Sequence, residues 1–147
     1  MTDSANILLI EDNPADSHLI SKAFEERCPG AKVFVASDGT AGSDFVFRRN
    51  LFAEAPRVDL IMLDLNLPGK DGREVLREIK ADPNLKTIPI LMFTSSASDT
   101  DIRTCYEAGA NAYFSKPADL EEFMSLIETI YVHWVKKAKL VPTAIDG

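Results

Sequence analysis

Five short apolar runs alternate with stretches of helical periodicity, and this alternation restricts the fold more than any other feature of the sequence. The run at 7–10 is continuously apolar and too short for a helix, which is typical of a strand buried on both sides, and that at 58–63 is the most hydrophobic; the run at 32–37 alternates and is rich in β-branched residues. Strands that alternate with helices predict a parallel sheet covered on both faces, so we expect a doubly wound α/β fold. The expected strands are 7–10, 32–37, 58–63, 88–93 and 112–115, and the expected helices run from 14 to the break at 28–30 and over 40–51, 73–81, 100–108 and 119–137.

Length, charge and cysteine content exclude several classes of protein. The 147 residues suit one domain with one hydrophobic core, and the net charge of −7 opposes attraction to nucleic acid or an anionic membrane. No apolar run approaches the roughly 18–20 residues of a membrane span, and the first residues do not resemble a signal peptide. Cys28 and Cys105 form no metal motif, so we expect reduced thiols in the cytoplasm.

Four of the expected strands end in distinctive polar residues. Glu11 and Asp12 follow the first strand, Asp64 the third, Thr94 the fourth and Lys116 the fifth. The carboxyl ends of parallel strands meet at one edge of the sheet, where ligands of such folds bind. Carboxylates gathered there repel one another unless a cation intervenes, and oxygen ligands with a phosphate suit Mg²⁺. Carboxylates, a divalent ion, an ammonium and a hydroxyl are the groups that phosphoryl transfer requires.

The sequence resembles the receiver domain of two-component response regulators over about residues 6–130. The acid pair at 11–12, the loop DLNLPGKDG at 64–72, the Thr94-Ser95 turn and GANAYFSKP at 109–117 match in order. Asp64 lies 30 residues before Thr94 and 52 before Lys116, which is the spacing of the family. The resemblance implies a flavodoxin-like fold with strand order 2-1-3-4-5.

The resemblance also implies a role for each site residue. Asp64 would accept a phosphoryl group from a sensor histidine kinase. Glu11, Asp12 and Asp64 would hold Mg²⁺ together with the backbone carbonyl of Asn66.

The remaining site residues would bind the phosphoryl group and report its presence. Thr94, Lys116 and the backbone N–H of Ser95 would bind phosphoryl oxygens. Thr94 would then move inward and let Tyr113 turn from an exposed to a buried position. The resemblance further implies a cis peptide bond between Lys116 and Pro117.

Only 31 residues follow Lys116, so we expect a single receiver domain over 1–137, a short tail over 138–147 and no output domain. The output would then be a protein contact or onward transfer to a phosphotransfer protein, without enzymatic turnover. The last helix carries an apolar stripe at inward spacing, formed by Phe123, Leu126, Ile127, Ile130, Tyr131 and Trp134.

The long C-terminal segment and the LNLPGKDG loop are similar to those of cyanobacterial phytochrome-associated regulators. This similarity implies a phytochrome as the sensor kinase. It also implies a homodimer through the fourth helix, fifth strand and fifth helix, together with the C-terminal extension.

Other functions fit parts of the pattern. A Mg²⁺-dependent phosphatase with an aspartate nucleophile would hydrolyse small phosphate esters, but such enzymes place an acid where this chain has Asn66. A flavodoxin-like FMN protein would need a phosphate-binding loop rich in Ser, Thr and Gly after the first strand. The sequence there is EDNPAD, whose acidic residues would repel phosphate. A pseudo-receiver that is never phosphorylated would not need the complete set of site residues.

Overall fold

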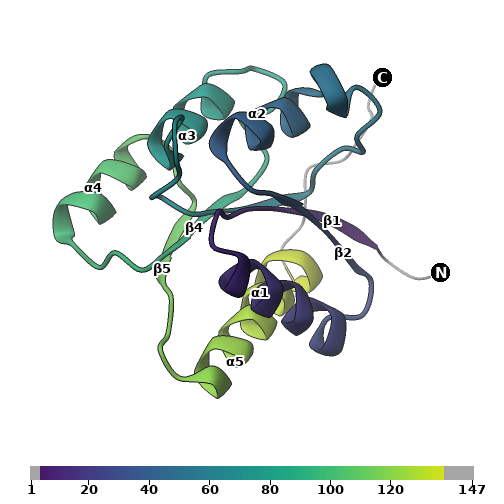
Figure 1. The fold of residues 1–147 in the computed structure, drawn as a ribbon, viewed down its shortest axis with the longest axis vertical. Helices are drawn as coiled ribbons and strands as arrows, with labels where there is room; N and C mark the ends of the chain where they lie inside the picture. The colour runs from purple at the N-terminus through teal and green to yellow at the C-terminus, as the bar shows by residue number, and fades with distance from the viewer. Residues whose placement is uncertain (1–3, 138–147) are drawn as a thin grey trace.

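A parallel sheet forms the middle layer of the structure, a computed structural model that describes residues 4–137 (Figure 1). Its strands are β1 (Ala5–Ile10), β2 (Ala31–Ala36), β3 (Leu60–Leu63), β4 (Ile90–Thr94) and β5 (Ala112–Ser115). They are hydrogen-bonded in the order β2-β1-β3-β4-β5, and every pair is parallel. The predicted strand order and fold class are therefore confirmed.

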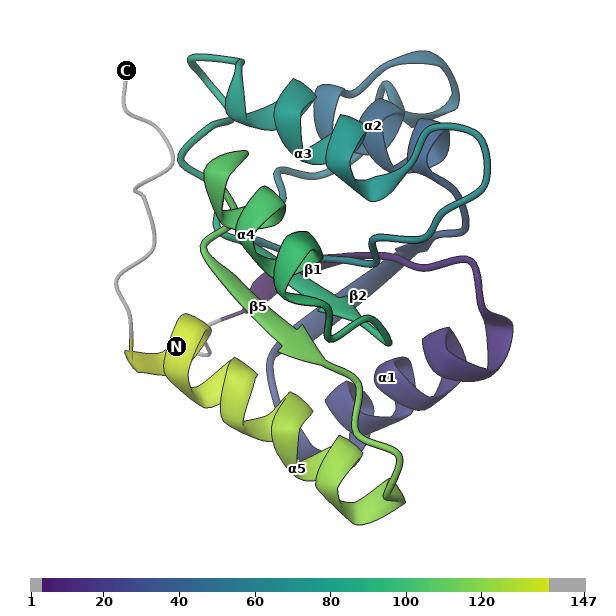
Figure 2. The same ribbon diagram turned by 90° about the vertical axis from the view of Figure 1, so that its left-hand side faces the viewer.

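Helices cover both faces of this sheet (Figures 1 and 2). α1 (Pro14–Arg27) and α5 (Leu120–Tyr131) lie on one face, and α2 (Gly39–Phe47), α3 (Gly72–Lys80) and α4 (Asp99–Glu107) lie on the other. A short 3₁₀ helix (Asn50–Phe52) follows α2, and a π-helical segment, η2 (Val132–Lys137), follows α5.

The strands supply two separate cores because successive side chains point to opposite faces. Ile7 and Leu9 of β1 pack in the cluster that includes α1 and α5, whereas Leu8 and Ile10 pack in the cluster that includes α2, α3 and α4. All four side chains are at most 1% exposed. Burial on both faces explains the continuous apolar runs of β1, β3 and β4, whereas β2 and β5 at the sheet edges are only partly buried. Close packing of the central strands fixes their ends at the sheet edge.

The expected helix 40–51 is longer than the helix observed. α2 ends at Phe47, because Arg48 takes a left-handed conformation with φ 56° and its backbone N–H bonds back to Asp44 and Phe45. Glycine is the usual residue at such a position, so the sequence gives no sign of this ending.

The apolar stripe of the last helix faces the core in large part. Phe123, Ile127, Ile130 and Tyr131 are buried, and Leu126 and Trp134 are half-buried against the same cluster. Within residues 4–137, no helix is long and apolar enough to cross a bilayer. The expected tail, 138–147, lies outside the described residues.

Candidate functional site

The sheet itself positions the three most important side chains of the site. Glu11, Asp64 and Lys116 each follow directly after a strand, and each backbone N–H still donates to the adjoining strand. The acceptors are the carbonyls of Ala36, Ile10 and Thr94, at 3.0, 3.0 and 2.8 Å. These ladder bonds hold the three residues at one edge, which is the convergence that the sequence predicts.

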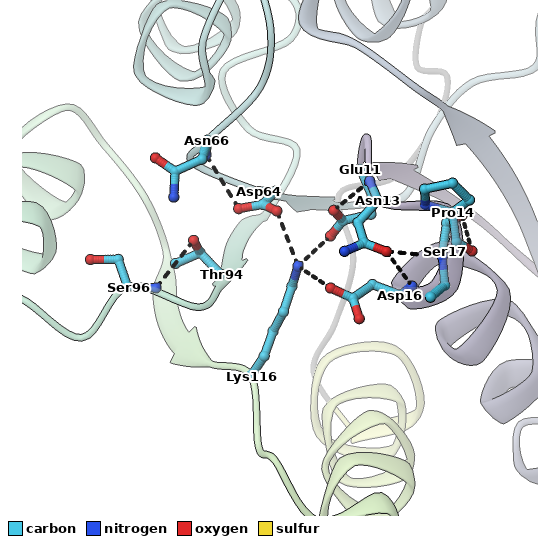
Figure 3. A network of polar contacts seen from close by, with 11 residues as sticks. Glu11, Asn13, Pro14, Asp16, Ser17, Asp64, Asn66, Thr94, Ser96 and Lys116 are labelled. Carbon is cyan, nitrogen blue, oxygen red and sulfur yellow. Dashed lines mark hydrogen bonds and ion pairs between the residues drawn. The ribbon is translucent and has the colours of Figure 1, made fainter.

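The Lys116 ammonium lies among three carboxylates (Figure 3). Nζ is 2.7 Å from Oε1 of Glu11, 2.8 Å from Oδ2 of Asp16 and 3.0 Å from Oδ2 of Asp64. The Lys116 side chain is only 7% exposed, so these contacts are shielded from water and are stronger than surface ion pairs.

Burial and neighbouring charges shift the pKa values of these groups in opposite directions. Burial raises the pKa of Glu11 to about 7, against the opposing effect of Lys116. Burial alone would also raise the pKa of Asp64, but the Lys116 ammonium and hydrogen bonds bring it below its ordinary value. Burial alone would lower the pKa of Lys116, and the surrounding carboxylates raise it instead. Asp64 is therefore ionised and Lys116 charged at neutral pH.

The acidic residues fit a hard divalent cation. Glu11, Asp12 and Asp64 each offer a carboxylate oxygen, and these oxygens lie within 4.8 Å of one another. Among the described residues, the buried Oε1 of Glu11 has no hydrogen bond, although it lies 2.7 Å from the Lys116 ammonium. An oxygen-only set with an incompletely satisfied buried oxygen suits Mg²⁺ or Mn²⁺.

The loop after β4 brings a second group of side chains to the site. Thr94 is fully buried at the end of β4, and its Oγ1 accepts a long hydrogen bond of 3.5 Å from the Ser96 N–H. Tyr113 is half-buried, and its hydroxyl donates to the Ser96 carbonyl at 3.0 Å, as does the Ser115 hydroxyl at 3.3 Å. Ser96 therefore links the loop to β5.

The same loop is also tied to α4 and α3. The Ser96 hydroxyl donates to Asp101 of α4 at 2.6 Å, and Asp101 is paired with Arg73 at the start of α3. Ser95 is exposed at the mouth of the site.

The segment after β3 returns tightly to the end of that strand. The Asn66 N–H donates to Oδ1 of Asp64 at 3.3 Å, while the Asn66 side chain is exposed. Gly72 begins α3 against this turn, and a Cβ placed on it would lie 2.3 Å from the Asp64 carbonyl oxygen. The lack of a side chain at Gly72 therefore allows the close approach of α3 to Asp64.

The structure brings the predicted residues to one edge, with two differences. Asp16 contacts the lysine although the sequence gives it no role, because an acid in the first turn of a helix ordinarily pairs only with the helix dipole. No cis peptide bond occurs within residues 4–137, so the expectation for Lys116–Pro117 is wrong. The trans form is the more stable isomer even before proline.

A β2-β1-β3-β4-β5 sheet with an acidic cluster and one buried lysine at its carboxyl edge defines the receiver class of α/β proteins. The sequence model of the family described as "Response regulator receiver domain" matches residues 7–128. The chain belongs to this family.

Individual relatives match over nearly their whole length. Response regulator Rcp1 of Synechocystis sp. is 37% identical over 144 residues, which cover 95% of this chain and 98% of that protein. A crystal structure of the Mn²⁺-bound form of Rcp1 has a TM-score of 0.88 at 36% identity, covering 94% of this chain and 99% of that one. The structure of the phosphorylated cyanobacterial phytochrome response regulator RcpA has a TM-score of 0.90 at 39% identity, covering 95% and 99%.

These comparisons confirm the predicted family and its resemblance to phytochrome-associated regulators. The family match does not favour the alternative of a phosphatase for small phosphate esters. The Mn²⁺ ion is a feature of the Rcp1 structure, and the phosphoryl group is a feature of the RcpA structure.

Proposed function

We propose that this chain is a response regulator that accepts a phosphoryl group on Asp64 and uses it to change its protein contacts. The observation that carries the proposal is the 3.0 Å contact between the Lys116 ammonium and an Asp64 carboxylate, beside the acidic cluster. This arrangement keeps Asp64 ionised and provides positive charge next to the attacking oxygen.

The chain supplies position and charge for the transfer. An Asp64 carboxylate oxygen attacks phosphorus in line, the P–N bond of a phosphohistidine breaks, and the imidazole nitrogen leaves with the bonding electron pair and takes up a proton. Lys116, the Thr94 hydroxyl and the Ser95 N–H are the donors for the phosphoryl oxygens. Lys116 is already in contact with Asp64, and Thr94 lies beside it (Figure 3).

Glu11, Asp12 and Asp64, with the Asn66 carbonyl, are the proposed ligands of Mg²⁺. The bound ion would neutralise charge that develops on the phosphoryl oxygens. The support is the oxygen-only cluster of three carboxylates, together with the Mn²⁺-bound form of the relative Rcp1. Water later hydrolyses the acyl phosphate, which limits the lifetime of the signal.

Thr94 and Tyr113 are the proposed switch. A phosphorylated aspartate carries about −2, so its oxygens attract the Thr94 hydroxyl and draw the loop after β4 toward Asp64. The loop carries the Ser96 carbonyl, which is the acceptor of the Tyr113 hydroxyl. Movement of the loop therefore changes the position that Tyr113 favours, and with it the surface of α4, β5 and α5.

The proposed phosphoryl donor is a sensor histidine kinase in the cytoplasm, and specifically a phytochrome. The likeness to the phytochrome response regulator RcpA supports this choice. Onward transfer to a phosphotransfer protein is the alternative output to a direct contact.

The proposal includes a homodimer through α4, β5 and α5 and the C-terminal extension. β5 is an edge strand, and large apolar side chains are exposed on Tyr106 of α4, Leu120 of α5 and Val132 of η2, at 48%, 62% and 39%. Light scattering coupled to size exclusion, with and without phosphorylation, tests the dimer. Elution of both forms as monomers at all concentrations would contradict it.

Intact-mass measurement after incubation with acetyl phosphate and Mg²⁺ tests the central proposal. We expect one phosphoryl adduct on the wild-type chain, none after addition of a chelator and none on Asp64→Asn. Asp99→Asn is the matched control, because it removes an exposed carboxylate at the start of α4 and should keep the adduct. An adduct on Asp64→Asn, or steady release of phosphate from many small esters, would reject the proposal.

A further inference from the structure

The Lys116 ammonium is surrounded by three carboxylates, and a phosphoryl oxygen must compete with them for it. Nζ donates hydrogen bonds to Asp16 and Asp64, and it forms an ion pair with Oε1 of Glu11 at 2.7 Å. A rearrangement of these carboxylates would therefore make the ammonium more available to a phosphoryl oxygen.

Two of the three carboxylates have a second task. Glu11 and Asp64 belong to the cluster whose oxygens can share a divalent cation, whereas Asp16 does not. The cation and the lysine therefore compete for the carboxylates of Glu11 and Asp64. Asp16 is the lysine partner that stays available after the cation binds.

Asp16 is held firmly for this task. It lies in the first turn of α1, where Asn13 is the N-cap, and its backbone N–H donates to the Asn13 side chain at 3.1 Å. From there its carboxylate reaches the ammonium from the side opposite Asp64 (Figure 3). The Asp16 side chain is 27% exposed, whereas that of Glu11 is 1% exposed, so water still reaches the Asp16 carboxylate.

We propose that Asp16 is a positioning residue that anchors Lys116 beside Asp64 and so reduces the competition between the lysine and the divalent cation. The inference rests on the proposed function of this site. With Asp16 present, the ammonium keeps one fixed partner while Glu11 and Asp64 turn to the cation. Without it, the ammonium relies on Glu11 and Asp64 alone and opposes binding of the cation.

A first experiment tests the anchor in the metal-free protein. Ammonium protons that are held by several acceptors exchange slowly with water and give a ¹H–¹⁵N signal, which we expect for Lys116 and assign with Lys116→Met. Asp16→Asn should broaden or remove that signal. The Lys80 ammonium is an internal reference, because it donates to the carbonyls of Lys86 and Ile88 and to the Asn111 side chain. These residues lie before β4 and β5, at the opposite end of the strands from Lys116.

A second experiment measures Mg²⁺ affinity by calorimetry, without any phosphorylation. Asp16→Asn should weaken binding about five- to tenfold, which corresponds to about 1–1.4 kcal/mol. Glu25→Gln is the matched control, because it removes one exposed charge from the same helix and should change the affinity by less than about twofold.

A double-mutant cycle shows whether Asp16 acts through the lysine. In a Lys116→Met background, Asp16→Asn should change Mg²⁺ affinity by less than about twofold, since the anchor then has nothing to hold. An equal loss of affinity in both backgrounds would overturn the inference, because Asp16 would then attract the cation directly. An unchanged Lys116 signal in Asp16→Asn would also overturn it.

The two proposals fail in different ways. Absence of a phosphoryl adduct on the wild-type chain rejects the proposed function, while the Lys116 signal and the cycle still decide the role of Asp16. A normal adduct with no coupling between Asp16 and Lys116 rejects only the positioning role.

Discussion

Thr94 is the last residue of β4, and its side chain is completely buried. Its Oγ1 accepts only a long hydrogen bond of 3.5 Å from the Ser96 N–H, and its hydroxyl proton can be donated to an oxygen on Asp64. Thr94→Ala should leave the phosphoryl adduct intact and weaken the response of α4, β5 and α5. Loss of one hydrogen bond to a charged group, about 1.5–3 kcal/mol, shifts the switch equilibrium at least about tenfold.

Amide chemical shifts of α4, β5 and α5, recorded before and after phosphorylation, measure that response. Thr94→Ser keeps the hydroxyl and should respond like the wild-type chain. Failure of Thr94→Ala to form the adduct would show that the hydroxyl serves the transfer itself and not the switch.

Gly72 illustrates how a residue without a side chain supports the site. A Cβ at this position would lie 2.3 Å from the Asp64 carbonyl oxygen and 2.8 Å from the Leu65 Cα, and both are backbone atoms that cannot move aside. Gly72→Ala should lower the free energy of unfolding by about 1–3 kcal/mol, as overpacking does, and displace Asp64. Urea denaturation measures this loss.

Gly69→Asn is the control for Gly72→Ala. Gly69 has φ +70° and open space around it, and asparagine tolerates that conformation, so we expect a change within about 0.5 kcal/mol. Equal stability of Gly72→Ala and the wild-type chain would mean that α3 can shift away from Asp64 at no cost.

At the scale of elements, the central strands could be predicted from the sequence because burial on both faces leaves short, continuous apolar runs. The run at 58–63 became β3 (Leu60–Leu63), and that at 88–93 became β4 (Ile90–Thr94), each within two residues at either end. The end of α2 could not be predicted, because the backbone of Arg48, an ordinary residue, takes the left-handed conformation there.

For the site, the sequence predicts which residues converge but not all of the contacts between their side chains. Convergence of Glu11, Asp64 and Lys116 follows from parallel topology alone, since each comes directly after a strand. The partners of Lys116 depend on side-chain geometry between distant elements, so Asp16 could not be distinguished from an ordinary acid of a first helical turn. The hydrogen bonds that meet at Ser96 are equally a product of packing.

Tyr113 joins β5 to the loop after β4 through one hydroxyl. Tyr113→Phe removes the 3.0 Å hydrogen bond to the Ser96 carbonyl, but the Ser115 hydroxyl still donates to the same oxygen. The acceptor is therefore not left unsatisfied, and we expect the free energy of unfolding to fall by no more than about 1 kcal/mol. Thermal or urea denaturation measures the change, and phosphorylation of Asp64 should proceed normally.

Tyr106→Phe is the matched control for Tyr113→Phe. Tyr106 lies on α4 and is 48% exposed, so removal of its hydroxyl should not change stability measurably. A loss well above about 1 kcal/mol in Tyr113→Phe alone would mean that the Ser115 hydroxyl does not compensate.

At the scale of the whole molecule, the site concentrates negative charge in a chain that is already acidic. The net charge is −7, and three carboxylates of the metal cluster lie close together with one ammonium between them and Asp16. Repulsion within such a cluster destabilises the folded state when no cation is bound, because the same charges are far apart in the unfolded chain. Stability without metal is therefore reduced for the sake of binding.

Asp12→Asn should raise the free energy of unfolding relative to the wild-type chain without metal and lower it relative to the wild-type chain in Mg²⁺. Asp12 is exposed, so neutralising it in a chelator relieves repulsion of about 1 kcal/mol or less and raises the free energy of unfolding. In Mg²⁺ at about 100 times its dissociation constant, the wild-type chain gains about 2.7 kcal/mol by mass action, and the variant with its weaker site gains less. Urea denaturation should therefore show the variant as the more stable protein in chelator and the wild-type chain as the more stable protein in Mg²⁺. Glu25→Gln should match the wild-type chain in both conditions. If Asp12→Asn is less stable than the wild-type chain in chelator as well, the Asp12 carboxylate stabilises the fold. Charge repulsion within the acidic cluster then does not destabilise the metal-free protein as we infer.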